Sequence, residues 1–154
     1  MKKKFDLLDK QILLILQNRA ELSNKQLAAL TNRSPTTIFG RIKKLFKSDL
    51  ILRTRAELNG KLLGFGIIGF IYLKISNHSR SNLELFKTKL EEIKGVSSCT
   101  SITGQNSLKI KIATYDTTAF NRIKTSIADL QGVTVVDSYV ELEDIIPDRG
   151  FDLI

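Results

Sequence analysis

The sequence predicts an α+β protein whose N-terminal part is helical and whose C-terminal part alternates strands and helices. Two patterns support this prediction. In the first sixty residues, apolar side chains recur at helical spacing in three segments. In the remaining residues, one apolar helix pattern occurs twice at a separation of 37 residues. A chain of 154 residues can form two very small domains of this kind.

The net charge of +8 lies entirely in the N-terminal part. Residues 1–60 hold 13 Lys or Arg and five Asp or Glu, whereas residues 61–154 hold 11 of each. A strongly basic segment joined to a neutral one implies a polyanionic partner. An anionic membrane would require a basic helix with an exposed apolar face, but the apolar positions here are needed for a helical core. We therefore expect double-stranded nucleic acid as the partner, and no membrane.

Capping residues place the helices of the basic part. A first helix is predicted over about residues 6–17. A second is predicted to start at Ser23, where Gln26 can reach back to the cap amide and complete a capping box. A third is predicted to start with Ser34 as cap and Pro35 at the first helical position, where a missing amide hydrogen costs nothing. The short second helix, the break and the capped basic helix together indicate a helix-turn-helix.

The third helix has the composition of a recognition helix. Ile38, Ile42 and Leu45 recur at i, i+4 and i+7 and are expected to face inward. The opposite face combines short side chains, which can approach base edges, with basic ones, which can neutralise phosphates. The predicted DNA-binding residues are Lys25, Arg33, Ser34, Thr36, Thr37, Gly40, Arg41, Lys43, Lys44 and Lys47.

Within this set, different roles are expected. Thr36, Thr37 and Arg41 are predicted to contact base edges or nearby phosphates, and the three later lysines mainly phosphates. Gly40 leaves two interpretations open, a close approach of the backbone to DNA or a glycine without a role. Arg53 and Arg55 either add phosphate contacts or belong only to a linker.

The C-terminal part predicts the order βαββαβ. Helices are expected around residues 83–93 and 120–130, each ended by a glycine. Strands are expected over residues 65–75, 96–103, 108–115 and 133–142. This order is that of a ferredoxin-like sandwich, in which two helices cover one face of a four-stranded sheet. The uncovered face predicts a homodimer, because most soluble oligomers are symmetric.

The expected domains follow from these patterns. They are a helix-turn-helix domain with a linker strand over residues 1–60, a ferredoxin-like domain over 61–142 for dimerisation and possible effector binding, and a tail over 143–154.

Composition limits the chemistry that the chain can perform. A single cysteine, Cys99, excludes an internal disulfide, and a lone His78 is expected in a loop rather than in a metal site. No nucleophile and base stand in a recognisable motif, so we expect neither an enzyme nor a metal or other cofactor. The longest apolar run, residues 62–73, is too short to span a bilayer, which favours a cytoplasmic protein. RNA is not the expected nucleic acid, because the strand segments are predicted to lack the aromatic platform of RNA-reading sheets.

Three motifs in the basic part resemble one family of regulators. They are residues 8–13 (LDKQIL), 23–28 (SNKQLA) and 34–45 (SPTTIFGRIKKL). The chain resembles members of the leucine-responsive/asparagine-responsive regulator family, Lrp/AsnC or feast/famine regulators. The resemblance implies a transcription regulator with a winged or plain helix-turn-helix that pairs sheets between subunits and forms dimers and often octamers. Many members bind an amino acid at the interface between C-terminal domains. The alternative function is an architectural DNA-compacting protein with little sequence preference.

The family's effector loop maps to Gly104, Gln105, Asn106 and Ser107. Members of the family usually carry two acidic residues after the glycine, and both are neutral here. An amino-acid ammonium group therefore loses its natural carboxylate partner. Two outcomes are open: an ordinary hairpin turn, which the sequence favours, or a site for a small-molecule effector (an amino acid or a related compound) whose polar groups suit these side chains.

Overall fold

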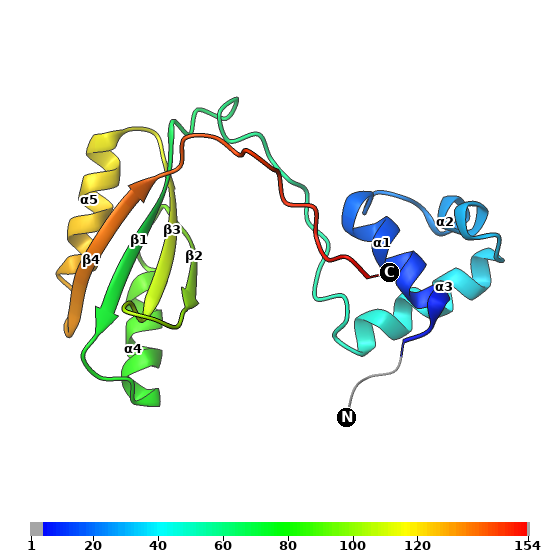
Figure 1. Cartoon of the computed structure of the whole chain (residues 1–154), viewed down its shortest axis with the longest axis horizontal. Coiled ribbons are helices and arrows are strands. Elements are labelled where there is room, and N and C mark those ends of the chain that lie inside the picture. Colours follow the sequence, from blue (N-terminus) through cyan, green and yellow to red (C-terminus); the bar gives the residue numbers. More distant parts are fainter. Residues whose placement is uncertain (1–4, 154) are drawn as a thin grey trace. The chain divides into compact units, whose positions relative to one another are not determined.

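The computed structural model describes residues 5–153 (Figure 1). The chain forms two compact units, one containing Met1–Glu57 with Ile146–Ile154 and the other containing Leu58–Ile145. The first unit has three helices among its described residues, and the second has a sheet with two helices. This architecture confirms the predicted α+β class. No helix within residues 5–153 is long and apolar enough to cross a membrane.

The first unit contains α1 (Leu7–Asn18), α2 (Asn24–Thr31) and α3 (Pro35–Lys47). The predicted capping box of α2 is present, since the Gln26 amide donates to Ser23 Oγ at 3.3 Å and the Ser23 amide donates to Gln26 Oε1 at 2.9 Å. The predicted cap of α3 is present too, because Ser34 Oγ accepts the Thr37 amide at 3.2 Å. Asn32 has a left-handed backbone conformation and ends α2. The end of α2 and the start of α3 are thus both set by residues close together in the sequence.

The core of this unit consists of apolar side chains from all three helices. Fully or nearly fully buried are Ile12, Leu27, Ala28, Ile38 and Leu45. The predicted linker strand is absent: residues 52–59 have no regular secondary structure. A strand requires a neighbour to share its hydrogen bonds, and none of the four strands in the described chain pairs with this segment.

The last residues of the chain also belong to this unit. Gln17, near the end of α1, donates through Nε2 to the Phe151 carbonyl oxygen at 2.7 Å and accepts the Phe151 amide at 3.0 Å. The tail after residue 145 is therefore held on α1 by a pair of side-chain to backbone hydrogen bonds.

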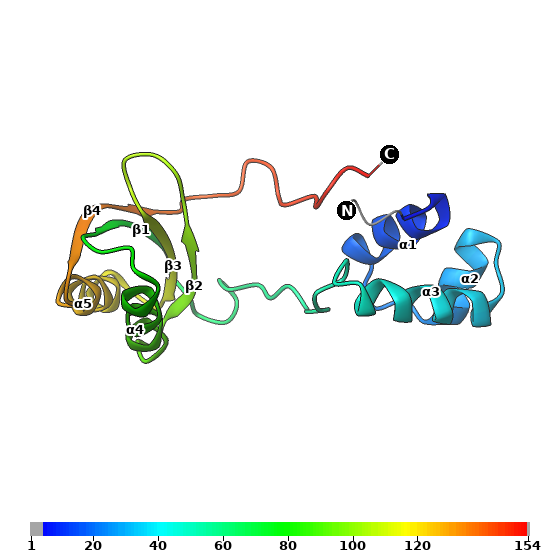
Figure 2. The same cartoon turned by 90° about the horizontal axis from the view of Figure 1, so that it is seen from below.

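The second unit has the predicted order βαββαβ. Its elements are β1 (Ile67–Ile75), α4 (Arg80–Glu91), β2 (Val96–Ser101), β3 (Leu108–Thr114), α5 (Thr117–Ala128) and β4 (Val133–Val140). The sheet order is β2-β3-β1-β4 and every pairing is antiparallel. Both helices lie on the same face of the sheet (Figure 2).

The core between sheet and helices is made by alternate residues of β1 and β3. Ile71, Leu73, Ile110 and Ile112 have no exposed surface, and they pack with the side chains of α4 and α5. Gly69 allows α5 to approach β1, because a Cβ there would lie 2.6 Å from Cε2 of Phe120. The intervening residues of each strand face away from the helices.

Candidate nucleic-acid interface and effector loop

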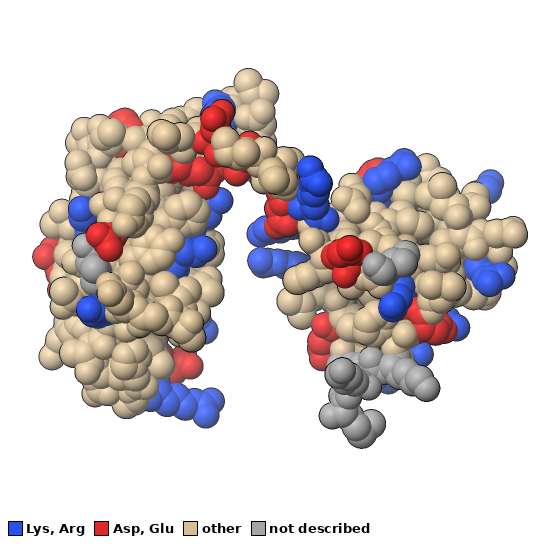
Figure 3. Space-filling model, in the orientation of Figure 1, with Lys and Arg blue, Asp and Glu red and all other residues tan. Residues whose placement is uncertain are grey.

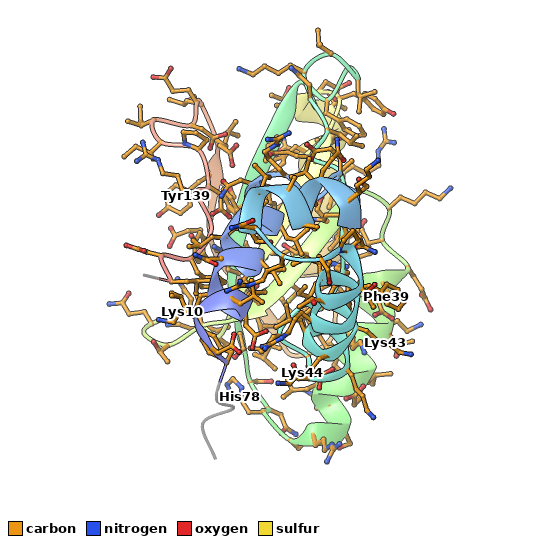
Figure 4. The ribbon with its side chains drawn as sticks, turned by 90° about the vertical axis from the view of Figure 1, so that its right-hand side faces the viewer. Lys10, Phe39, Lys43, Lys44, His78 and Tyr139 are labelled. Atoms are coloured by element: carbon orange, nitrogen blue, oxygen red, sulfur yellow. The ribbon has the colours of Figure 1, made fainter. Side chains whose placement is uncertain are left out.

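The outer surface of α3 is exposed and contains no acidic residue. Its inward side is formed by Ile38 and Leu45, which are buried, and by Ile42, which is partly buried. Exposed along its outer surface are Thr36, Thr37, Gly40, Lys43, Lys44 and Lys47. Arg33 and Ser34, just before α3, and Lys25, in the first turn of α2, are exposed as well. Lys43 and Lys44 extend from α3 in Figure 4. Of the ten residues predicted to bind DNA, six are therefore exposed on α3, two are exposed just before it, and Lys25 is exposed in the first turn of α2.

Arg41, the tenth residue, is directed into its own unit. Its guanidinium pairs with Asp6, and its Nη1 lies 3.1 Å from Oδ1 of Asp9. The Asp9 side chain is 2% exposed, and that of Arg41 is 31% exposed. The ion pair thus joins α3 to the start of α1. We expected Arg41 to contact a base or phosphate, and the structure instead gives this charge two intramolecular partners.

The same cluster shifts the pKa values of Asp6 and Arg41. The Asp9 amide and the Arg41 guanidinium hold the pKa of the Asp6 carboxyl below its ordinary value. The carboxylates of Asp6 and Asp9 raise the pKa of Arg41. Asp6 and Asp9 also form a capping box at the start of α1, in which each carboxylate accepts the other's backbone amide.

The loop between β2 and β3, residues 102–107, contains the residues of the expected effector site. Gly104 has φ +110°, and a Cβ there would meet no atom within 4 Å. The Ser107 amide donates to the Leu73 carbonyl oxygen at 2.8 Å, which fixes the end of the loop on β1. Asn106 Oδ1 is buried and has no hydrogen-bond partner among the described residues. A buried acceptor without a donor is costly, so this atom is the best sign of a ligand position in the loop.

His78 is a neighbour of this loop that sequence reasoning did not assign to it. Its Nε2 lies 3.4 Å from Ser107 Oγ, although the two residues are 29 positions apart. The contact arises because the segment after β1 passes beside the end of the β2–β3 loop. No local pattern in the sequence indicates this proximity. Among residues 5–153, no three His, Cys, Asp or Glu side chains are grouped to hold a metal ion.

The helix-free face of the sheet carries aromatic residues. The rings of Tyr72 and Tyr139 meet edge to face at 5.6 Å. The ammonium groups of Lys109 and Lys111 lie 5.2 and 5.6 Å from the Phe70 ring centre. The interpretation that the strands lack an aromatic platform was therefore wrong. The remaining surface of this unit mixes both signs of charge in the view of Figure 3, in keeping with its near balance of basic and acidic residues.

Known proteins match both units of the chain. Residues 5–51 match the winged helix-turn-helix DNA-binding domain, and residues 68–151 match the Lrp/AsnC ligand binding domain. The chain belongs to the Lrp/AsnC family. The second match runs from the second residue of β1 through β4 and includes the loop of Gly104 and Asn106.

Individual relatives of this Lrp/AsnC chain cover nearly its whole length. The proline dehydrogenase transcriptional activator of Rhizobium radiobacter is 30% identical over 141 residues, which are 91% of this chain and 90% of that protein. The HTH-type transcriptional regulator FL11 of Pyrococcus furiosus is 28% identical over 138 residues, or 90% and 89% of the two chains. A transcriptional regulator of Neisseria meningitidis, solved as a complex with L-Met, has the same fold with a TM-score of 0.84 at 24% identity over 93% of each chain.

Replacing Arg41 tests whether its main role is structural. Arg41→Ala leaves the Asp9 carboxylate buried without its cation, and we expect a loss of about 1–3 kcal/mol in the free energy of unfolding. Urea unfolding followed by circular dichroism measures this loss. Lys43→Ala, which removes an exposed cation two residues away, should change stability by less than about 0.5 kcal/mol.

The decrease in the free energy of unfolding that Arg41→Ala causes should also depend on pH. The pKa of the Asp6 carboxyl is lowered in the folded chain. Asp6 therefore contributes to the free energy of unfolding at pH values above its unfolded pKa near 4, and this contribution is lost as the pH falls through its pKa in the folded chain. The difference between wild type and Arg41→Ala should shrink over that range. Equal stabilities at neutral pH, together with an altered DNA sequence preference, would show instead that Arg41 reads a base.

Proposed function

We propose that this Lrp/AsnC chain regulates transcription in the cytoplasm by binding double-stranded DNA through α3. The observation that carries the proposal is the exposed, acid-free surface of α3 within the part of the chain that holds the whole net charge of +8. A helix with these properties fits the major groove, where short side chains meet base edges and basic ones meet phosphates.

The exposed residues divide into two roles under this proposal. Lys43, Lys44 and Lys47, with Arg33 before α3 and Lys25 on α2, neutralise phosphates. Thr36 and Thr37 lie in the first turn of α3 and contact base edges, while Ser34 caps the helix.

Gly40 supports a close approach of the helix to DNA. A glycine inside a helix costs about 1 kcal/mol relative to alanine, and a Cβ at this position would touch no other part of the protein. Packing within the chain therefore does not explain the glycine, whereas a nearby DNA backbone or base edge does.

An architectural role is the less favoured alternative. The relatives are named as transcriptional regulators or activators, and we infer sequence-selective binding for this chain. A regulator should bind a fragment of its own promoter more tightly than random DNA at the same salt concentration, whereas an architectural protein should not.

Salt dependence tests the proposed DNA surface. Each phosphate contact that is lost should lower the slope of log affinity against log salt by about 1, because one fewer counterion is released. We expect this change for Lys43→Ala, Lys44→Ala and Lys47→Ala in fluorescence anisotropy titrations at several salt concentrations. Lys87→Ala, on α4 of the other unit, is the matched control and should keep the wild-type slope. A wild-type affinity that is insensitive to salt would contradict the proposal.

We further propose that the helix-free face of the sheet pairs with a second copy of the chain, and that such dimers assemble further. Phe70, Tyr72 and Tyr139 form an apolar surface there, and Tyr139 is 56% exposed. Burying such surface against a symmetry-related copy is favourable by about 25 cal/mol per Å².

The dimer can be tested in the full chain with two matched variants. Tyr139→Glu places a charge on the proposed contact and should lower the mass measured by light scattering at micromolar concentration. Leu85→Glu introduces the same charge on α4, at a side chain that is 57% exposed, and should leave the mass unchanged. A wild-type monomer, or equal masses for both variants, would exclude pairing through this face.

We also propose that the β2–β3 loop binds a small molecule with an N–H or O–H donor. The buried Asn106 Oδ1 needs such a donor, and Gly104 leaves space above the loop. The Neisseria relative was solved with L-Met, and an amino acid carries a suitable ammonium group. The alternative is an unliganded hairpin turn, in which this acceptor has no partner within the described chain.

Thermal-shift screening against the common amino acids tests the loop. A ligand at about 100 times its Kd stabilises by roughly 2.7 kcal/mol, which raises Tm by several degrees. Asn106→Leu and Gly104→Val should abolish the shift. Without ligand, Asn106→Leu should not lower Tm, because the acceptor that it removes is unpaired. Absence of a saturable shift with every amino acid would support the hairpin-turn alternative.

A further inference from the structure

Phe39 is an exposed aromatic residue on the recognition helix. It lies in α3 between Ile38, which is completely buried, and Gly40, and its own side chain is 57% exposed. It does not belong to the buried core cluster of the unit or to the partly buried side chains around that cluster. Figure 4 shows Phe39 and Lys43 along the same side of α3, with Lys44 on another side. The ring is therefore available to whatever α3 contacts.

Its helical neighbours connect Phe39 with the proposed DNA surface. Residues three and four apart are adjacent on a helix, which places Phe39 between Thr36, at one end, and Lys43, at the other. In the proposed complex the first meets base edges and the second a phosphate. A side chain between them faces the floor or wall of the major groove.

The chemistry of the groove limits what a phenyl ring can bind there. Base edges in the major groove present hydrogen-bond donors and acceptors, and the one apolar group among them is the C5 methyl of thymine. A phenyl ring has no hydrogen bond to offer, and contact with polar edges would only remove water from them. Contact with a methyl group removes two apolar surfaces from water.

We propose that Phe39 reads a thymine by packing its ring against the C5 methyl group in the major groove. The inference rests on the proposed insertion of α3 into that groove. Phe39 is then a specificity-determining residue without charge. It differs from the lysines, which contact phosphates, and from the threonines of the first turn, whose hydroxyl groups contact base edges.

The experiment removes the methyl group from the DNA and the ring from the protein. Duplexes are selected from a random-sequence pool with the full-length wild-type protein, and each thymine in turn is replaced by deoxyuridine, which lacks only the methyl group. The wild type should lose about fourfold in affinity at one thymine per half-site, the equivalent of one buried methylene-sized group. Phe39→Ala should bind the thymine and deoxyuridine duplexes equally well at that position.

Two further variants serve as controls. Phe46→Ala removes an exposed ring, 42% accessible, from the last turn of α3, and it should retain the wild-type sensitivity to deoxyuridine. Phe39→Leu keeps an apolar side chain and should retain part of the sensitivity to deoxyuridine. Neither variant changes charge, so the salt dependence should stay that of the wild type.

Three results would overturn the inference. The first is a wild-type protein that is indifferent to every thymine replacement, and the second is Phe39→Ala with an undiminished loss at the same thymine. The third is Phe39→Ala that changes the mass of the assembly without altering sensitivity to deoxyuridine, which would place the ring in a protein contact. All three differ from failure of the DNA surface itself, which is a salt-independent affinity of the wild type.

Discussion

The ion pair between Arg41 and Asp9 determines which groups on α3 remain free. A carboxylate that is 2% exposed requires a cation, and α3 supplies one from its middle. The pairing places the start of α1 against the middle of α3, and the Asp6–Asp9 capping box adds further hydrogen bonds at the same point. The orientation of the recognition helix within its unit therefore depends on an electrostatic contact as well as on the apolar core.

Elements governed by short-range chemistry could be predicted from the sequence. The Ser23–Gln26 box, the Ser34 cap and the repeat with its 37-residue spacing involve residues that are close together or patterns that recur. The α+β class and the βαββαβ order of elements along the chain followed from them. The helix-turn-helix was predicted for the same reason, since each cap and each apolar spacing lies within a single helix.

Features that depend on distant residues could not be predicted. Arg41 and Asp9 are 32 positions apart, and in the sequence Arg41 looks like any other basic residue of the outer helix surface. The aromatic face of the sheet was missed because β1 contributes two rings and β4 contributes the third. Phe70 and Tyr72 lie on one face of β1, but only the register that brings Tyr139 opposite Phe70 adds the third ring. The missing partner of Asn106 is likewise visible only when its surroundings are known.

The inward direction of Arg41 has a consequence for how DNA sequence is read. Without it, the side chains in the first half of the outer α3 surface are neutral: Thr36, Thr37 and Phe39, followed by Gly40. Hydroxyl and methyl contacts discriminate less than a bidentate arginine on guanine, whereas the lysines of the second half attract any sequence. One copy of α3 would then bind DNA firmly but select weakly. A symmetric dimer presents two copies of α3 to two half-sites. Discrimination energies at separate base pairs add. Pairing through the sheet would therefore give the dimer a selectivity between DNA sequences that one helix lacks.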